Sequence, residues 1–135
     1  MKKFWPVLIL VLILSSSCVD RKTSFLIGKW KEASRIANPS KEYIWTFKDD
    51  NNFTIEIYDI EEATGGPISV YEGEYNLDRK SFEYRLDLQL DTDISGHPVR
   101  GEYWVDELDR NNLKITREDA DVDGTPFLRY EFQKL

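Results

Sequence analysis

Few residues in this chain of 135 have types and spacings that suggest chemistry, and the most regular of them are three carboxylates. Asp119, Asp121 and Asp123 alternate before Gly124, as in the first half of a calcium-binding loop, where alternate carboxylates converge on the cation. The second half does not follow, because the twelfth place holds Tyr130 instead of a glutamate. We therefore interpret the segment as a solvated loop between strands and expect no metal site.

The only histidine, His97, lies in a segment that reads Ser-Gly-His-Pro. It has no second histidine to complete a zinc site, and no nucleophile lies at an informative spacing. The sequence also has no glycine-rich phosphate loop and no Gly-x-Ser-x-Gly motif. We expect His97 at the surface of a loop, and we expect neither a catalytic function nor a cofactor.

The only cysteine, Cys18, ends the most distinctive segment of the chain. Lys2 and Lys3 form a basic head, residues 4–14 form an apolar run, and three serines occupy positions 15–17. This is the layout of a secretory signal peptide, and the apolar run is shorter than the ~20 residues that cross a bilayer as a helix. The segment also resembles the signal of bacterial lipoproteins, in which the cysteine thiol is diacylated and the cysteine becomes the new N-terminus.

The lipoprotein resemblance implies a division of the chain into three parts. Residues 1–17 are the signal peptide, residues 18–24 are a lipidated tether, and residues 25–135 are one folded domain. The protein is then held at the bacterial cell envelope, on the periplasmic or surface side, by palmitate and related acyl chains on Cys18. The alternative is plain secretion with a free thiol, although a single unpaired cysteine is unusual in exported proteins.

Charge and cysteine content exclude several classes of function. The chain has 18 basic and 25 acidic side chains, for a net charge of −7, and has no basic cluster. Such a chain repels phosphate backbones, so we expect no nucleic-acid partner. One cysteine cannot form an internal disulfide, so the domain must be stabilised by its apolar core.

Short runs in which apolar and polar side chains alternate dominate the domain. This period-2 pattern predicts strands with one buried face, and Asn, Asp and Gly cluster between the runs as hairpin loops require. The expected strands are 28–36, 42–48, 53–58, 69–77, 81–91, 99–107, 113–118 and 126–133. Eight sequential antiparallel strands, each with one apolar face, favour an all-β, eight-stranded up-and-down barrel, which leaves no unpaired edge. A two-sheet sandwich is the structural alternative.

The first expected strand contains Gly28 and Trp30 in the order Gly-x-Trp. This resembles the motif that opens the first strand of lipocalins and of small bacterial lipocalin-like lipoproteins. The resemblance implies that the glycine permits a close approach of the backbone and that the tryptophan plugs the closed end of the barrel. It further implies an arginine from a late strand over the tryptophan ring, for which Arg117 and Arg129 are the candidates.

An eight-stranded barrel can be filled by side chains or can hold one small molecule. Residues that the alternation places inside the barrel are the candidates for a small hydrophobic ligand: Trp45, Phe47, Ile55, Tyr75, Phe82, Tyr84, Leu86, Leu88, Tyr103 and Phe132. We expect the hydroxyls of Tyr75, Tyr84 and Tyr103 to orient such a ligand. The competing hypothesis is a packed barrel that binds or inhibits an envelope protein through the loops 61–67 and 92–98 and an exposed Trp104.

Overall fold

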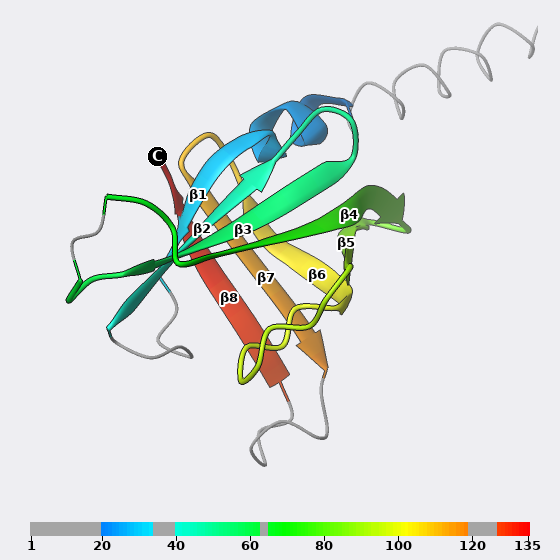
Figure 1. Cartoon of the computed structure of the whole chain (residues 1–135). Coiled ribbons are helices and arrows are strands. Elements are labelled where there is room, and N and C mark those ends of the chain that lie inside the picture. The colour runs from blue at the N-terminus through cyan, green and yellow to red at the C-terminus, as the bar shows by residue number, and fades with distance from the viewer. Residues whose placement is uncertain (1–19, 34–39, 63–64, 119–126) are drawn as a thin grey trace, which may run out of the picture.

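The computed structural model describes residues 20–33, 40–62, 65–118 and 127–135, and within them it forms one closed antiparallel barrel of eight strands (Figure 1). Each strand pairs with its neighbours in sequence order, and the last pairs with the first. The strands are β1 (Gly28–Glu32), β2 (Lys41–Phe47), β3 (Asn52–Asp59), β4 (Ser69–Lys80), β5 (Glu83–Leu90), β6 (Gly101–Leu108), β7 (Asn112–Glu118) and β8 (Phe127–Lys134). The all-β, up-and-down barrel expected from the sequence is therefore confirmed.

β1 ends at Glu32, whereas the sequence pattern extended the first strand to residue 36, and a second departure lies at the hairpin between β4 and β5. The sequence pattern began the fifth strand at residue 81 and placed Phe82 inside the barrel. In the structure β4 continues to Lys80, Ser81 has a positive φ of 59°, and Phe82 lies in the turn with 92% of its surface exposed. The interior prediction for Phe82 is wrong, because a tight turn takes its residues out of the alternation that governs the strands.

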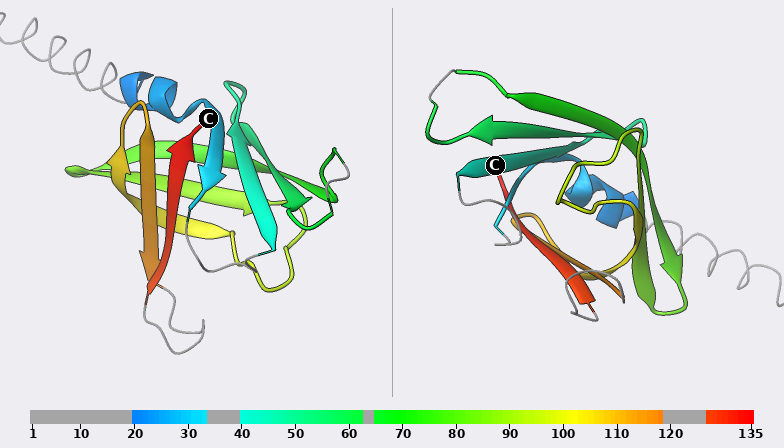
Figure 2. Two further views of the ribbon diagram at one scale, coloured as in Figure 1. Left: turned by 90° about the vertical axis from the view of Figure 1, so that its left-hand side faces the viewer. Right: turned by 60° about the horizontal axis from the view of Figure 1, so that its bottom comes forward.

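Residues 20–26 form a short helix that covers one end of the barrel (Figures 1 and 2). The sequence suggested a polar tether up to residue 24, but Leu26 is fully buried and Lys22 Nζ donates a hydrogen bond to Leu108 O, 2.8 Å away. We call this end, marked by the helix, Trp30 and Lys134, the helix end. Residues 1–19, which include Cys18, lie outside the described residues.

The opposite end of the barrel carries the connection between β5 and β6, residues 91–100, drawn yellow-green in Figure 1. β1 ends at this end with Glu32, β2 begins there, and β8 enters from it. We call it the histidine end, after His97 in the connection.

Aromatic rings pack against one another inside the barrel. Trp45 is fully buried and its ring contacts four others, with centroid distances of 4.9–6.3 Å, namely those of Phe47, Phe53, Tyr130 and Phe132. Leu86 and Leu88 on β5 belong to the same buried cluster. The face of each strand that alternation predicted as buried is thus the face that builds this core.

Candidate functional site

At the helix end, Gly28 and Trp30 lie in β1, next to the short helix at 20–26. Gly28 has a φ of 131°, which side chains other than glycine rarely adopt, and a Cβ there would lie 2.7 Å from Lys134 Nζ. Trp30 is fully buried, and its Nε1 donates to Leu26 O at 2.8 Å. The absence of a side chain at Gly28 therefore leaves room for Lys134 at the helix end.

Lys134, rather than Arg117 or Arg129, provides the cation over the tryptophan. Its Nζ lies 4.4 Å from the centre of the Trp30 ring and donates to Phe25 O at 2.9 Å and Ile27 O at 2.6 Å. These carbonyls lie at the C-terminal end of the helix, where backbone oxygens lack helical donors and where a positive charge is favourable.

The two arginines expected at this position lie elsewhere. Arg117 lies over the ring of Tyr103, 5.3 Å from its centre, and Arg129 forms an ion pair with Glu131. The expectation failed because β1 and β8 pair Trp30 with Lys134, a register that becomes known only when the barrel closes.

At the histidine end, the structure buries a pair formed by His97 and Glu32 that the sequence analysis did not anticipate. His97 Nε2 lies 3.0 Å from Glu32 Oε2, and the side chains are 1% and 2% exposed. The expected surface position of His97 is therefore wrong. Residues 91–100 turn inward instead, and the backbone N–H of His97 donates to Ile94 O, which closes a tight turn.

The surroundings of the pair determine where its hydrogens lie. Trp45 Nε1, which can only donate, gives a second hydrogen bond of 3.1 Å to Glu32 Oε2. That oxygen is thus the acceptor, and His97 Nε2 carries the hydrogen directed at it. His97 Nδ1 is buried and has no hydrogen-bond partner among the described residues.

Three tyrosines complete this end of the barrel. Tyr43 stacks on His97 with ring centroids 4.2 Å apart and planes 11° from parallel, and Tyr130 lies 5.4 Å away on another side. Tyr130 Oη donates to Pro98 O and Tyr103 Oη donates to Val99 O, so both hydroxyls hold the connection that carries His97. We name Glu32, Tyr43, His97 and Tyr130 the histidine-end cluster.

The phenols of this cluster keep their protons at neutral pH. Burial raises the pKa of Tyr130 well above its usual value, and the nearby Tyr103 phenol and Glu32 carboxylate add to the effect, against an opposing contribution from Arg117. Burial, followed by the charges of Glu32 and Tyr71, also raises the pKa of Tyr43. The cluster can therefore offer hydrogen bonds and ring surfaces to a bound molecule, but it does not offer a phenolate.

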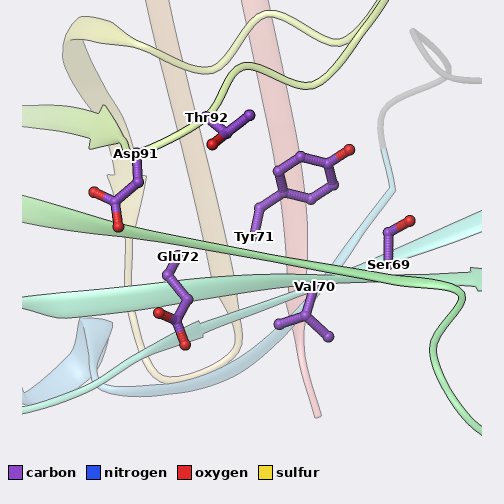
Figure 3. A pocket seen from close by; sticks show the side chains of 6 residues that line it. All are labelled: Ser69, Val70, Tyr71, Glu72, Asp91 and Thr92. Carbon is purple, nitrogen blue, oxygen red and sulfur yellow. The ribbon is translucent and has the colours of Figure 1, made fainter.

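Two open hollows border the 91–100 connection. One, of about 600 Å³, is lined by Ser69, Val70, Tyr71, Glu72, Asp91 and Thr92 (Figure 3). The other, of about 370 Å³, is lined by residues 93, 94 and 96–100, with Arg117. In Figure 3, Ser69 and Tyr71 point to the side of β4 on which Thr92 lies, whereas Val70 and Glu72 point to the other.

Nine of the ten residues predicted to face a ligand lie in or against the core. Tyr84 is only partly buried, with Lys22 Nζ 5.9 Å from its ring centre, and Phe82 is exposed in its turn. The buried eight are Trp45, Phe47, Ile55, Tyr75, Leu86, Leu88, Tyr103 and Phe132. Three tyrosine hydroxyls were expected to orient a ligand. Those of Tyr75 and Tyr103 instead donate to the backbone carbonyls of Lys48 and Val99.

Sequence reasoning missed Glu32, although a signal for it was present. Trp30 and Glu32 are two residues apart in one strand, so period-2 alternation places both side chains inside the barrel. A carboxylate on a buried face requires partners. Its partners, His97 and Trp45, come from a loop and another strand, and no spacing in the sequence connects them.

Comparisons with protein-family models, with curated proteins and with solved structures found no match to this chain. Within the described part of the chain, no three His, Cys, Asp or Glu side chains gather to hold a metal ion. The expected loop at 119–124 lies outside that part. None of the helical segments that are described is long and apolar enough to cross a membrane.

Proposed function

We propose that this protein is a lipid-anchored, lipocalin-like binding protein of the bacterial cell envelope. Its ligand is a small, mostly apolar molecule with one hydroxyl group, and it binds at the histidine end of the barrel. The anchor is proposed from the sequence alone, namely the basic head, the short apolar run and the single cysteine at position 18. The domain serves as a carrier or sensor and holds the ligand without transforming it.

One observation carries the location of the site: His97 Nδ1 is buried without a hydrogen-bond partner among the described residues. An unfilled position of this kind costs free energy, about 1–3 kcal/mol, unless something occupies it. Ligand sites combine apolar and aromatic walls with a few placed polar groups, as the rings of Tyr43 and Tyr130 around His97 do. A hydroxyl can donate to the nitrogen or accept from it.

The packed rings around Trp45 support the histidine end over the middle of the barrel. A ligand there would have to displace several aromatic contacts. His97, by contrast, borders a hollow of about 370 Å³ beside the 91–100 connection, and Glu32 holds the imidazole in place. We infer that the ligand reaches His97 from this hollow.

A matched pair of probes tests the site. We expect 2-naphthol to bind the full chain at least tenfold more tightly than naphthalene, as measured by calorimetry, because only the naphthol can hydrogen-bond to His97. In His97→Phe, which keeps a planar ring, the preference should disappear. Leu88→Trp, which adds volume beside Gly101 near this end, should weaken both probes.

The outer-surface variant Arg85→Ala is the control, and it should bind both probes like the wild type. Arg85 lies over Trp104 on the outer surface, 4.6 Å from its ring, away from the cluster. Equal affinity for the two probes in the wild-type protein would refute the site. So would a preference for naphthol that survives in His97→Phe.

The anchor has its own test. Cys18→Ser should abolish palmitate labelling and move the protein from the membrane fraction to the soluble fraction, because no thiol remains to be acylated. Unchanged labelling or unchanged fractionation would disprove lipidation at this residue.

A further inference from the structure

The hollow of about 370 Å³ that borders His97 is also lined by an arginine, Arg117. This residue lies near the end of β7, two positions beyond Ile115, which is fully buried. It pairs with Leu128 on β8, which is 3% exposed. Residues two apart in a strand, and residues directly opposite across a strand pair, share one face of the sheet. Arg117 therefore belongs to the inner face of the barrel, at the histidine end.

A glycine and a tyrosine of β6 hold the guanidinium in place. Gly101 has a φ of 141°, which side chains other than glycine rarely adopt, and a Cβ there would lie 2.6 Å from Arg117 Nη1. Two residues on, the ring of Tyr103 is fully buried, and Arg117 Cζ lies 5.3 Å from its centre. The guanidinium thus occupies the space that Gly101 leaves, beside an aromatic ring that attracts cations.

The helix end has the same three-part arrangement, formed by Gly28, Trp30 and Lys134. There too, a glycine precedes an aromatic residue by two positions, and a cation from the adjoining strand lies against both. The surroundings of the two cations differ, because Lys134 donates to two backbone carbonyls of the helix segment whereas Arg117 lines an open hollow. A cation on the wall of a hollow can contact a molecule that binds there.

The charge of Arg117 acts on the groups around His97. It opposes the rise in the pKa of Tyr130, whose hydroxyl donates to Pro98 O next to the histidine. A guanidinium is planar and presents its N–H donors as a fork, which matches the two oxygens of a carboxylate. With several donors, it can bind a carboxylate while it keeps its other contacts.

Two carboxylates near the hollow leave this position suited to an acid. Asp93 is exposed and forms an ion pair with Arg100, with Oδ1 2.9 Å from Nε. Glu32 binds His97 at Nε2, not at Nδ1. The net charge of −7 acts over distances that salt screens, to ~8 Å at physiological ionic strength. Contacts within the hollow therefore decide whether an acid binds.

We propose that the ligand of the histidine end carries a carboxylate as well as a hydroxyl group, and that Arg117 binds the carboxylate. The ligand is then a small, mostly apolar hydroxy acid that contacts both His97 and Arg117. This inference rests on the proposed binding site, because it uses the same hollow. It adds the ionic group of the ligand and the residue that selects it.

The test compares an acid with its own methyl ester, by calorimetry on the full chain. The probes are 6-hydroxy-2-naphthoic acid and 6-hydroxy-1-naphthoic acid, which place the carboxylate at two positions relative to the hydroxyl. We expect the tighter-binding acid to bind at least tenfold more tightly than its ester, because the ester has no charge to pair with Arg117. The ratio of the two affinities is the readout, since a change in packing shifts both.

Arginine substitutions separate pairing in the hollow from charge in general. In Arg117→Gln the ratio should fall to about one. In Arg117→Lys, which keeps the charge but loses the fork, it should lie between the values of Arg117→Gln and the wild type. The control is Arg129→Gln on the neighbouring strand, where the arginine is exposed and pairs with Glu131, and its ratio should equal that of the wild type. Circular dichroism confirms that each variant is folded.

Two results would overturn this inference and leave the proposed site intact. One is equal affinity for each acid and its ester in a protein that still prefers 2-naphthol to naphthalene. The other is a preference for the acid that survives in Arg117→Gln, which would place the carboxylate elsewhere. Absence of the preference for 2-naphthol over naphthalene would instead refute the site itself.

Discussion

Each end of the barrel holds a charged side chain, partly buried at the helix end and buried at the histidine end, but the two are satisfied to different degrees. At the helix end, the ammonium of Lys134 donates to two backbone carbonyls and lies over the ring of Trp30. At the histidine end, Glu32 accepts from Trp45 and pairs with His97, which keeps one nitrogen without a partner in the described residues.

This difference in hydrogen bonding distinguishes an end that only stabilises the fold from an end that leaves a hydrogen-bond position unfilled. A buried polar group with all its partners fixes one structure, whereas an unfilled hydrogen-bond position lowers stability and is retained where something else uses it. The helix end resembles a plug, held by a glycine, a tryptophan and a lysine. The histidine end is the binding site that we propose, and the following predictions test this contrast.

The largest effect is expected at the helix end, from Trp30→Ala. The substitution empties a fully buried position and removes both the indole donor to Leu26 O and the ring below Lys134. We expect the free energy of unfolding to fall by about 3–5 kcal/mol, the range for large aromatic truncations in a core. Urea denaturation measures it, and a loss below about 1 kcal/mol would show that this end is not a plug.

At the histidine end, Glu32→Ala should cost somewhat less, about 2–3 kcal/mol. It leaves the N–H groups of His97 and Trp45 buried without their acceptor, and each such group is expensive. Glu32→Gln, which retains an acceptor oxygen, should lose about half as much. The same urea titration compares the variants.

A double variant, Glu32→Leu/His97→Leu, sharpens the result. Replacing a whole buried pair by apolar side chains is often neutral or stabilising. We expect the double variant to be more stable than Glu32→Ala and to bind 2-naphthol no better than naphthalene. A double variant less stable than Glu32→Ala would mean that the pair supports the fold.

Removal of the cation, in Lys134→Met, should have a smaller effect of about 1–2 kcal/mol at neutral pH. The variant keeps an apolar stem over the ring but leaves Phe25 O and Ile27 O without their donor. Thermal unfolding measures the loss. Lys29→Met, on the exposed face of the same β1 strand, is the control and should change little.

The two ends should also respond to pH in opposite directions. Burial lowers the pKa of Lys134, because it disfavours the charged form. The cost of burying this charge is present below the folded pKa and disappears as pH rises to the unfolded value of about 10.5, so the titration of Lys134 makes stability rise with pH. The raised pKa values of Tyr43 and Tyr130 act the other way. Their contribution is full below about pH 10 and is lost as pH rises further, because the phenols ionise first in the unfolded chain.

Stability curves between pH 8 and 12 measure this contrast. Tyr130→Phe should flatten the fall in stability above pH 10. Lys134→Met should remove the rise in stability with pH just below pH 10. If both variants kept the wild-type profile, neither end would govern alkaline stability.

The sequence predicts the helix end better than the histidine end, for a physical reason. Gly28 and Trp30 lie two residues apart in one strand, and their Gly-x-Trp motif is visible in the sequence. Lys134 could not be assigned to Trp30, because that contact depends on how the last strand meets the first. Register across the closure of a barrel is a property of the whole sheet.

The histidine end is completed by a loop, residues 91–100, and loop sequences show no hydrophobic periodicity from which burial could be predicted. Strand alternation correctly placed Trp45 and Tyr103 inside the barrel, but it gave no information on residues 91–100. His97 is buried because the connection folds back over the ring of Tyr43, and that contact joins residues 54 positions apart. The helix at 20–26 was missed because seven residues are too few to show a helical period.

The smallest effect is expected from Phe82, which belongs to neither end's buried cluster although the alternation of its strand suggested otherwise. Its side chain is 92% exposed in the β4–β5 turn, so Phe82→Ser removes almost no buried surface. We expect the free energy of unfolding to change by no more than about 0.5 kcal/mol, as is usual for exposed positions. Leu86→Ser, on the buried face of the adjoining strand, is the matched comparison, since Leu86 is fully buried. Chemical denaturation of the two variants distinguishes the turn from the strand, and a loss of 2 kcal/mol or more in Phe82→Ser would mean that this ring packs against the barrel after all.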